Sequence, residues 1–326
     1  MTASTGRPPL LIVNPSSGGG RTGSVFESMR GPIERVVGPV DVIFTERKRH
    51  AVDIAREAAL AGRETVVAVG GDGSIHEVVN GLMEAREELP ENALKTRLGI
   101  IGQGTGGDFR RTLGIEHRLN RYCEVIAAGA TRRIDIGRFR YVANDGSPAQ
   151  GFFVNILSMG MGGLVDQYVA DMGRQLGGTL TYLIASMRGL VNSQLGVLQC
   201  SMTTRGGETR EEILPTRTIA VCNGRYFGSG MKVAPMAEPD DGVFEIIDLG
   251  NAPRLKFFLE SSKIYTGKHL KNPAVKHFRC DRFEAKLLNE AADNAFLLDV
   301  DGEPLGKLPI SIELVPNAVE VLAPRL

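Results

Sequence analysis

One stretch of the chain combines an isolated carboxylate with a cluster of glycines, a combination suited to phosphate chemistry. It is Gly70-Gly71-Asp72-Gly73, within Thr65-Val-Val-Ala-Val-Gly-Gly-Asp-Gly-Ser-Ile-His-Glu-Val-Val-Asn-Gly-Leu82. Glycines let the backbone approach a phosphate closely because they carry no Cβ. Asp72 would supply the negative charge that a metal ion or a hydroxyl proton needs. The alternative is an ordinary turn that Asp72 only shapes.

The flanking residues predict which elements hold this turn. Val66–Val69 is a short β-branched run, typical of a buried strand. Ser74 and Glu77 have the S-x-x-E spacing of a capping box, which predicts the start of a helix. The turn would then lie between a strand end and a helix N-terminus, where free N–H groups and the helix dipole favour an anion.

The same order of strand, glycine loop and helix occurs twice more in the first third of the chain. Leu10–Val13 precedes Asn14–Gly23, and Leu98–Ile101 precedes Gly102–Phe109. Another predicted strand ends just before Thr45, whose hydroxyl is a further candidate ligand. This repetition predicts a parallel α/β sheet whose carboxyl-edge loops gather in one crevice.

A competing interpretation starts from the pattern G-x-G-x-x-G. Gly18–Gly23 matches it, and Asp41 follows near the distance of a ribose-binding carboxylate, which would suggest a dinucleotide-dependent oxidoreductase. Gly102–Gly107 matches as well, so the pattern arises easily in a chain with 40 glycines. A Walker A lysine loop and the protein-kinase signatures are both missing from the sequence.

From about Ile134 the sequence changes to short, often alternating apolar runs separated by Gly, Pro, Asn and Asp. These runs predict a mostly antiparallel, β-rich second domain, either a sandwich or a distorted barrel. We therefore expect an α/β nucleotide-binding domain over 8–133 and a β-rich domain over 134–326, with the last strand returning to the first domain. A helical insertion is expected over Gly178–Val191, where an apolar stripe occurs.

Composition limits the classes of function. The chain has 326 residues with 38 Lys+Arg and 38 Asp+Glu, so no global field attracts nucleic acid. The four cysteines lack C-x-x-C spacing, which favours reduced thiols in the cytoplasm over disulfides or zinc. Neither a signal segment nor an apolar run of about 18 residues occurs, so we expect only peripheral membrane contact. Lys263–Lys286 carries seven Lys/Arg, two acids and two phenylalanines, and either anionic lipid or plain solvent would suit it.

Several passages in a fixed order resemble the diacylglycerol kinase catalytic family, which includes bacterial lipid kinases, sphingosine kinases and ceramide kinases. The main ones are Asn14-Pro-Ser-Ser-Gly18, Gly70-Gly-Asp-Gly-Ser-Ile-His-Glu-Val-Val-Asn-Gly-Leu82, Gly104-Thr-Gly-Gly-Asp-Phe109 and Asp301-Gly-Glu303. Val221–Pro235, Pro239–Phe244 and Gly267–Pro273 agree with the family's order as well. The chain departs from the pattern at Gly102 and Gly107, where the family usually has proline and asparagine.

The resemblance implies a two-domain kinase with ATP between an α/β domain and a lipid-binding domain. It implies that the nucleotide is lined by Asn14, Pro15, Ser16, Ser17, Gly18, Thr45, Gly70, Gly71, Asp72, Gly73, Ser74, Ile75, His76, Gly104 and Thr105. Glu303 resembles the proton acceptor for the substrate hydroxyl, with Asp72 and Asp301 beside it. A structural Mg²⁺ site corresponds to backbone oxygens of Glu238 and Val243 and the carboxylate of Asp241.

The sequence therefore predicts transfer of the γ-phosphate of ATP, with Mg²⁺, to a hydroxyl of diacylglycerol or a similar lipid at a membrane surface. A ceramide or sphingoid-base kinase is the nearest alternative. NAD kinase, which shares the Gly-Gly-Asp-Gly turn, is more distant, and a nucleotide-binding protein without transferase activity is a different class. A homodimer is left open.

Overall fold

The computed structural model describes residues 7–104, 106–143, 145–161, 168, 189, 194–289, 292 and 296–324. The chain forms two compact units, Met1–Asp135 with Pro316–Leu326, and Ile136–Val315. It passes from one unit to the other within strands β5 (Thr131–Val142) and β16 (Lys307–Leu322). Thr105 lies outside the described residues. So does the predicted helical insertion over Gly178–Val191, apart from Gly189.

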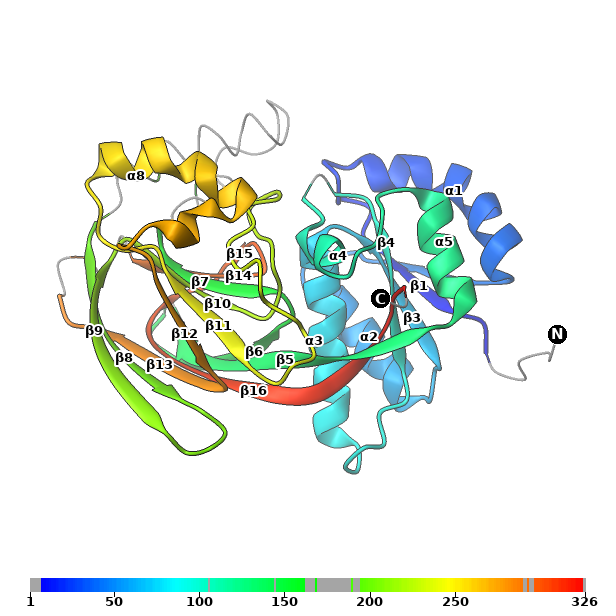
Figure 1. Cartoon of the computed structure of the whole chain (residues 1–326). Coiled ribbons are helices and arrows are strands. Elements are labelled where there is room, and N and C mark those ends of the chain that lie inside the picture. Colours follow the sequence, from blue (N-terminus) through cyan, green and yellow to red (C-terminus); the bar gives the residue numbers. More distant parts are fainter. Residues whose placement is uncertain are drawn as a thin grey trace. The chain divides into compact units, whose positions relative to one another are not determined.

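The first unit is built on a parallel sheet in the order β2-β1-β3-β4-β16 (Figure 1). Its first four strands are β1 (Leu10–Val13), β2 (Asp41–Phe44), β3 (Thr65–Gly70) and β4 (Arg97–Gly102). Strands β1 and β3 are buried throughout because helices cover both faces of such a sheet. The predicted α/β domain with a parallel sheet is thus confirmed.

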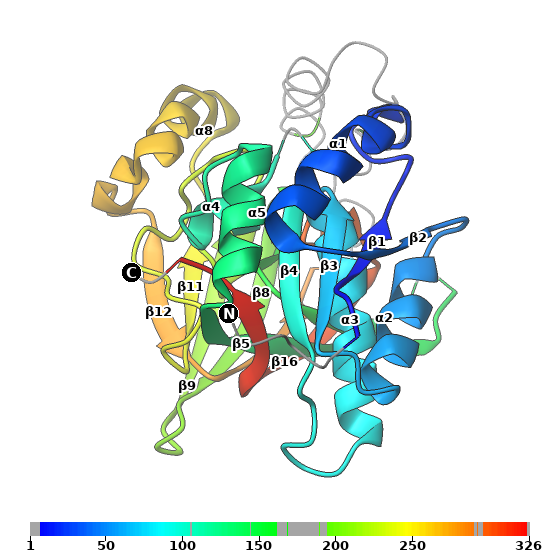
Figure 2. The same ribbon diagram turned by 90° about the vertical axis from the view of Figure 1, so that its right-hand side faces the viewer.

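Helices flank this sheet on its two faces. They are α1 (Arg21–Val37), α2 (His50–Leu60), α3 (Asp72–Glu88), α4 (Asp108–Thr112) and α5 (Leu119–Ala128). Helices α1 and α5 pack together on one face, and α2 and α3 pack together on the other (Figure 2). In α1 the residues Phe26, Met29 and Ile33 are buried, whereas Val25 is exposed one position outside that stripe.

The second unit is an antiparallel sandwich. One sheet has the order β12-β11-β10-β7-β14-β15, and the other contains β16-β13-β8-β9 with β5-β6 beside them. The strands not yet given are β6 (Pro148–Phe153), β7 (Ile156–Gly160), β8 (Gly196–Thr203), β9 (Thr209–Thr216), β10 (Thr218–Cys222), β11 (Phe244–Asp248), β12 (Lys276–Cys280), β13 (Arg282–Leu287), β14 (Leu297–Val300) and β15 (Glu303–Pro304). Between β11 and β12 lie α8 (Arg254–Ser261) and the 3₁₀ helices η1 (Ser262–Thr266) and η2 (Lys268–Lys271). The predicted β-rich, mostly antiparallel second half is confirmed.

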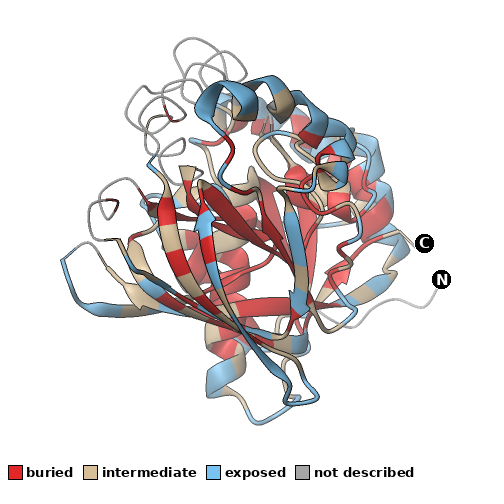
Figure 3. Cartoon of the chain, turned by 60° about the vertical axis from the view of Figure 1, so that its left-hand side comes forward, coloured by how far each residue is buried: buried red, intermediate tan, exposed pale blue. Residues whose placement is uncertain are grey.

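An apolar core lies between the inner faces of these two sheets. Phe153 stacks on Phe244 with ring centroids 5.5 Å apart, and Phe283 packs in the same cluster. Many residues of the strands around this core are coloured as buried in Figure 3. Strand β8 alternates buried and half-buried residues, as expected for a strand with one face in the core. All four cysteines are buried and free. Of the helices in the part of the chain that the structure describes, none is long and apolar enough to cross a membrane.

Candidate active site

The loops that follow β1, β3 and β4 contact one another at the carboxyl edge of the parallel sheet. The backbone N–H of Gln103 donates to the carbonyl of Gly70 at 2.8 Å, and that of Asn14 donates to Val69 at 3.0 Å. The side-chain amide of Asn14 also donates to the hydroxyl of Ser74 at 3.2 Å. The structure therefore brings together three of the predicted phosphate-binding segments.

Glycines make this approach possible. A Cβ placed on Gly18, where φ is +62°, would lie 2.7 Å from the carbonyl oxygen of Gln103. A Cβ on Gly104 would lie 3.1 Å from the Cα of Gly71, and one on Gly70 would lie 2.2 Å from the hydroxyl of Ser74. The loops thus pack backbone against backbone, and side chains at these positions would force them apart.

Asp72 is the first residue of α3, and its carboxylate binds the loop that follows β4. It accepts backbone N–H groups from Gly107 at 2.8 Å, from Asp108 at 3.3 Å and from Phe109 at 3.3 Å. Gly107 is the N-cap of α4 and the other two residues begin it, so Asp72 caps that short helix from the start of α3. The carboxylate predicted to act in catalysis therefore also fixes the shape of the site.

The predicted capping box at Ser74 is wrong. Helix α3 already begins at Asp72, with Gly71 as its N-cap and without a side-chain cap. Glu77 does not turn back to the start of its own helix, because its carboxylate accepts the backbone N–H groups of Arg49 (2.9 Å) and Ala51 (3.3 Å). Its role is to hold the start of α2 against α3.

The other predicted ATP-binding residues of this unit lie in the first loop, at the end of β2 or within helix α3. Within the first loop, Ser16 N–H donates to the side chain of Asn14 at 3.0 Å, and Ser17 is buried with its hydroxyl bonded to the Asn14 carbonyl at 2.9 Å. Thr45 N–H donates to Val13 at 2.8 Å, which holds the end of β2 beside that loop. Ile75 is a core residue, so only its backbone remains for a ligand.

Three more predicted ATP-binding residues, Pro15, Gly73 and His76, lie in the first loop or in helix α3. Pro15 lies against Gly23, where a Cβ would approach its ring at 3.0 Å. Gly73 lies in the first turn of α3, and His76 follows in the next turn, where Asn80 donates to its carbonyl at 2.9 Å. Nucleotide contacts of all these residues stay predictions.

The position of Asp41 argues against the dinucleotide-binding interpretation. Asp41 is the first residue of β2 and pairs with Leu10, the first residue of the parallel strand β1. It therefore lies at the amino edge of the sheet, whereas Gly18–Gly23 lies at the carboxyl edge. Its carboxylate is bonded to Arg63 at 2.6 Å. An acid at that edge cannot bind the ribose of a nucleotide held by the glycine loop.

The two family departures each have a steric cause. A Cβ on Gly102 would lie 2.5 Å from the hydroxyl of Tyr122, which bonds His117 Nδ1 at 2.8 Å. Tyr122 is buried, and burial raises the pKa of its hydroxyl to about 12. Gly107 has φ +62°, and a Cβ there would lie 2.6 Å from Arg110 Nε. Tyr122 and Arg110 thus occupy space that larger residues at 102 and 107 would need.

In the second unit, Asp301-Gly302-Glu303 forms the turn between β14 and β15. The buried Asp301 carboxylate accepts backbone N–H groups of Val154 (3.0 Å), Asn155 (2.9 Å) and Ile156 (3.1 Å). Glu303 is half-buried, and none of the residues that the structure describes bonds its carboxylate. Asp301 therefore holds the turn, while Glu303 keeps its oxygen atoms available.

Sequence reasoning missed Asp299, which completes this turn. One of its oxygens accepts Gly302 N–H at 3.1 Å, and the other accepts the hydroxyl of Ser158 at 3.2 Å. Asp299 is buried in the otherwise apolar strand β14. The sequence does contain a signal for Asp299, because an acid inside an apolar strand is buried and needs hydrogen-bond partners within the protein.

The predicted metal ligands lie in the turn before β11. Asp241 accepts Val243 N–H at 3.2 Å and a guanidinium N–H of Arg279 at 3.1 Å, and the Glu238 side chain pairs with Arg225. One carboxylate and two backbone carbonyls are oxygen donors of the type that Mg²⁺ prefers. Arg279 competes for that carboxylate, and no cluster of three or more His, Cys, Asp or Glu side chains occurs among the described residues. The oxygen donors of this turn fit Mg²⁺, although Arg279 shares the Asp241 carboxylate, and the site stays a prediction.

Comparisons with known proteins agree with this geometry. Residues 8–139 match the family described as diacylglycerol kinase catalytic domain, and residues 155–323 match the YegS C-terminal NAD kinase beta sandwich-like domain. A diacylglycerol kinase of Bacillus subtilis is 25% identical over 97% of this chain and 96% of its own length. One of Staphylococcus aureus is 26% identical over 97% of this chain and 92% of its own length.

Solved structures show the same fold. A diacylglycerol kinase structure from Bacillus anthracis superposes with a TM-score of 0.71 at 21% identity, covering 98% of both chains. Yeast NADH kinase in complex with NADH superposes with a TM-score of 0.51 at 13% identity, covering 99% of this chain and 85% of its own. The match over residues 155–323 spans more than half of the chain, so the chain belongs to the family with the YegS C-terminal domain; with the diacylglycerol kinase catalytic domain before it, the protein is an enzyme of the kinase class.

Proposed function

We propose that this protein is an ATP-dependent lipid kinase that transfers the γ-phosphate of ATP to a hydroxyl of diacylglycerol or a similar lipid. The observation that supports this most is the backbone packing of three glycine loops at one sheet edge. Phosphoryl transfer needs positioned backbone amides and charge neutralisation more than covalent chemistry from the protein. The loops after β1, β3 and β4 supply such amides.

The three acids of the predicted site have different roles in this proposal. Glu303 accepts the proton of the lipid hydroxyl, because its carboxylate carries no bond from the described residues. Asp72 and Asp301 each accept three backbone N–H groups, which engages much of their acceptor capacity. They act as positioning residues, Asp72 within the first unit and Asp301 within the second. Asp72 is also proposed to help hold a metal ion, because it lies in the glycine turn where the phosphates are proposed to bind.

Mg²⁺ would accompany ATP in this reaction. When bound, it supplies positive charge to the phosphates as the γ-phosphoryl group transfers. In the first unit, Asp72 would help hold this Mg²⁺. A second, structural ion would bind the turn at Glu238, Asp241 and Val243. These ligands are proposed by resemblance and by their oxygen chemistry.

Diacylglycerol is the favoured acceptor because two relatives that align over nearly the whole chain are named diacylglycerol kinases. Ceramide and sphingoid bases offer a similar hydroxyl on a lipid and are the second choice. NAD is a weaker candidate, since the likeness to yeast NADH kinase at 13% identity concerns the fold alone.

The test is an assay with γ-labelled ATP and Mg²⁺ against micellar diacylglycerol, monoacylglycerol, ceramide and sphingosine, with NAD as a control. We expect label in phosphorylated diacylglycerol, and loss of most of that label with Glu303→Gln. Label in phosphorylated ceramide or sphingosine instead of diacylglycerol would change the acceptor, and label in NAD with none in any lipid would refute lipid kinase activity.

A further inference from the structure

An unusual surface of the second unit lies on α8 and the two 3₁₀ helices after it. Leu255 is 72% exposed and Leu259 is 66% exposed, and their spacing of four residues places them on one side of α8. Tyr265 of η1 is also more than half exposed. Large apolar side chains exposed together in this way usually mark an interaction surface.

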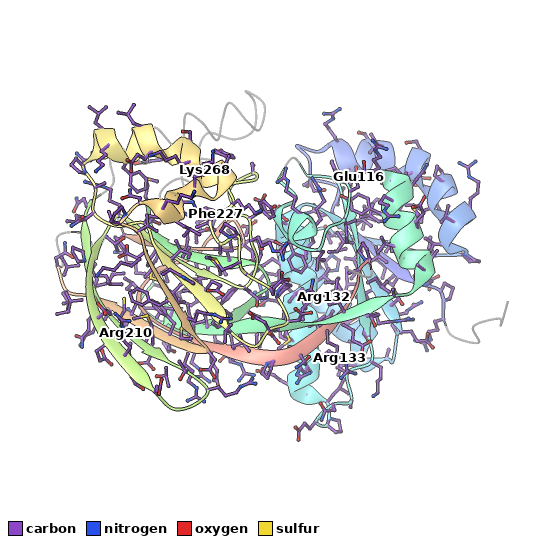
Figure 4. The ribbon with its side chains drawn as sticks, viewed as in Figure 1. Glu116, Arg132, Arg133, Arg210, Phe227 and Lys268 are labelled. Carbon is purple, nitrogen blue, oxygen red and sulfur yellow. The ribbon has the colours of Figure 1, made fainter. Side chains whose placement is uncertain are left out.

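The charge of this segment is strongly one-sided in a chain whose net charge is zero. Residues 249–275 contain five Lys/Arg and a single acid, Glu260. Glu260 accepts Lys263 Nζ at 3.5 Å and Asn272 Nδ2 at 2.7 Å, so its charge is partly neutralised within the segment. Among the described residues, no acid pairs with Lys256, Lys268 or Lys271; Figure 4 labels Lys268 beside α8.

In the rest of the basic stretch Lys263–Lys286, several cations and both phenylalanines already contact other residues of the protein. Phe283 is a core residue, and the ring of Phe278 is covered by the guanidinium of Arg210 at 4.8 Å. Arg279 pairs with Asp241 and Glu245, and Arg282 pairs with Glu313. The cations and apolar side chains that can meet a partner together are therefore those of α8, η1 and η2.

We propose that α8, η1 and η2 form the surface by which this protein docks on an anionic lipid bilayer. Leu255 and Leu259 enter the boundary between headgroups and acyl chains, and Lys256, Lys268 and Lys271 contact the anionic headgroups. A second copy of this surface is a poor partner because the two like-charged faces would repel each other. A nucleic acid is equally poor because it offers nothing apolar to the leucines.

This inference rests on the proposed lipid kinase function, since a lipid acceptor must be taken from a membrane. Its test is flotation of the protein with vesicles of phosphatidylcholine, alone or mixed with phosphatidylglycerol. The variant is Leu255→Gln with Leu259→Gln. The control is Ile213→Gln on β9, because Ile213 is 63% exposed but lies outside the proposed surface.

We expect wild type to float with the anionic vesicles and not with the neutral ones. The double leucine variant should lose about tenfold or more in partitioning, the scale expected for two exposed leucines that enter the lipid. Lys256→Glu with Lys268→Glu should lose the preference for anionic vesicles, whereas Ile213→Gln should float as wild type does. Urea unfolding of each variant establishes that it is folded.

Two readouts separate this proposal from the kinase proposal. Phosphorylation of a short-chain diacylglycerol in neutral detergent micelles should be unchanged in the double leucine variant, because such a substrate requires no bilayer docking. If all forms lack kinase activity but flotation behaves as expected, only the kinase proposal fails. Equal flotation of wild type and the leucine variant, or a dimer in sedimentation that the leucine changes abolish, would overturn the docking proposal.

Discussion

Two acids separated by one glycine should respond to amide substitution in opposite ways. Asp301 holds three buried backbone N–H groups, two on one oxygen and one on the other. In Asp301→Asn, one oxygen becomes an NH₂ group that faces an N–H donor. A buried donor left without a partner costs about 1–3 kcal/mol, and loss of charge weakens the other bonds by about 1 kcal/mol more. We expect the free energy of unfolding to fall by about 2–4 kcal/mol.

Glu303→Gln should instead leave stability unchanged to within about 0.5 kcal/mol, because its half-buried carboxylate has no bond to lose among the described residues. Its effect should fall on turnover. A positioned base contributes roughly 10²-fold or more to the rate, and 10²-fold corresponds to about 2.7 kcal/mol in the activation free energy. Stability and turnover are thus separated between two side chains of one turn.

The assay combines urea unfolding, followed by circular dichroism, with initial rates at saturating ATP and micellar diacylglycerol. Asp299 provides a matched control, because Asp299→Asn should also destabilise the turn through its bonds to Gly302 and Ser158. A free energy of unfolding equal to wild type in Asp301→Asn would refute the role of Asp301 in holding the turn. Near-wild-type turnover of Glu303→Gln would remove Glu303 from proton transfer.

Three further results are expected. Asp72→Asn should loosen the start of α4, lowering the free energy of unfolding by about 1–3 kcal/mol and turnover by roughly 10²-fold, and normal kinetics would exclude its positioning role. Gly102→Ala should lower the urea midpoint, and adding Tyr122→Phe should restore part of it by removing the hydroxyl 2.5 Å from the new Cβ; the absence of any rescue would refute that contact. Burial lowers the pKa of His269, so the folded state resists protonation, and stability should fall as pH drops below about 6.5. His269→Gln should flatten that fall in urea midpoints between pH 8 and pH 5, and an unchanged slope would assign it to other groups.

The sequence predicted well those elements whose burial pattern is local. The runs at β1, β3 and β4 are short and fully or largely apolar, because both faces of a central parallel strand are covered. Strand β9 is harder to predict because it is the edge of its sheet and its sequence, Thr-Arg-Glu-Glu-Ile-Leu-Pro-Thr, is mostly polar. Strand β16 contains Pro309 and Pro316, which normally argue against a long strand.

The composition of the candidate site could be predicted, but not the partners of its side chains. Ser74 and Glu77 have the spacing of a capping box, yet Glu77 binds the start of α2, which lies far away in sequence. The three N–H partners of Asp72 likewise come from a different loop, at positions 107–109. Spacing along one helix carries no information about such contacts, because they depend on how neighbouring strands align.

The central claim is that the loops after β1, β3 and β4 hold the triphosphate of ATP. It is tested most directly by a crystal structure of the protein with Mg²⁺ and a non-hydrolysable ATP analogue. We predict phosphate oxygens within hydrogen-bond distance of backbone N–H groups in Asn14–Gly18, in Gly70–Gly73 and at Gly104. An analogue bound elsewhere while these loops carry no phosphate would contradict the claim.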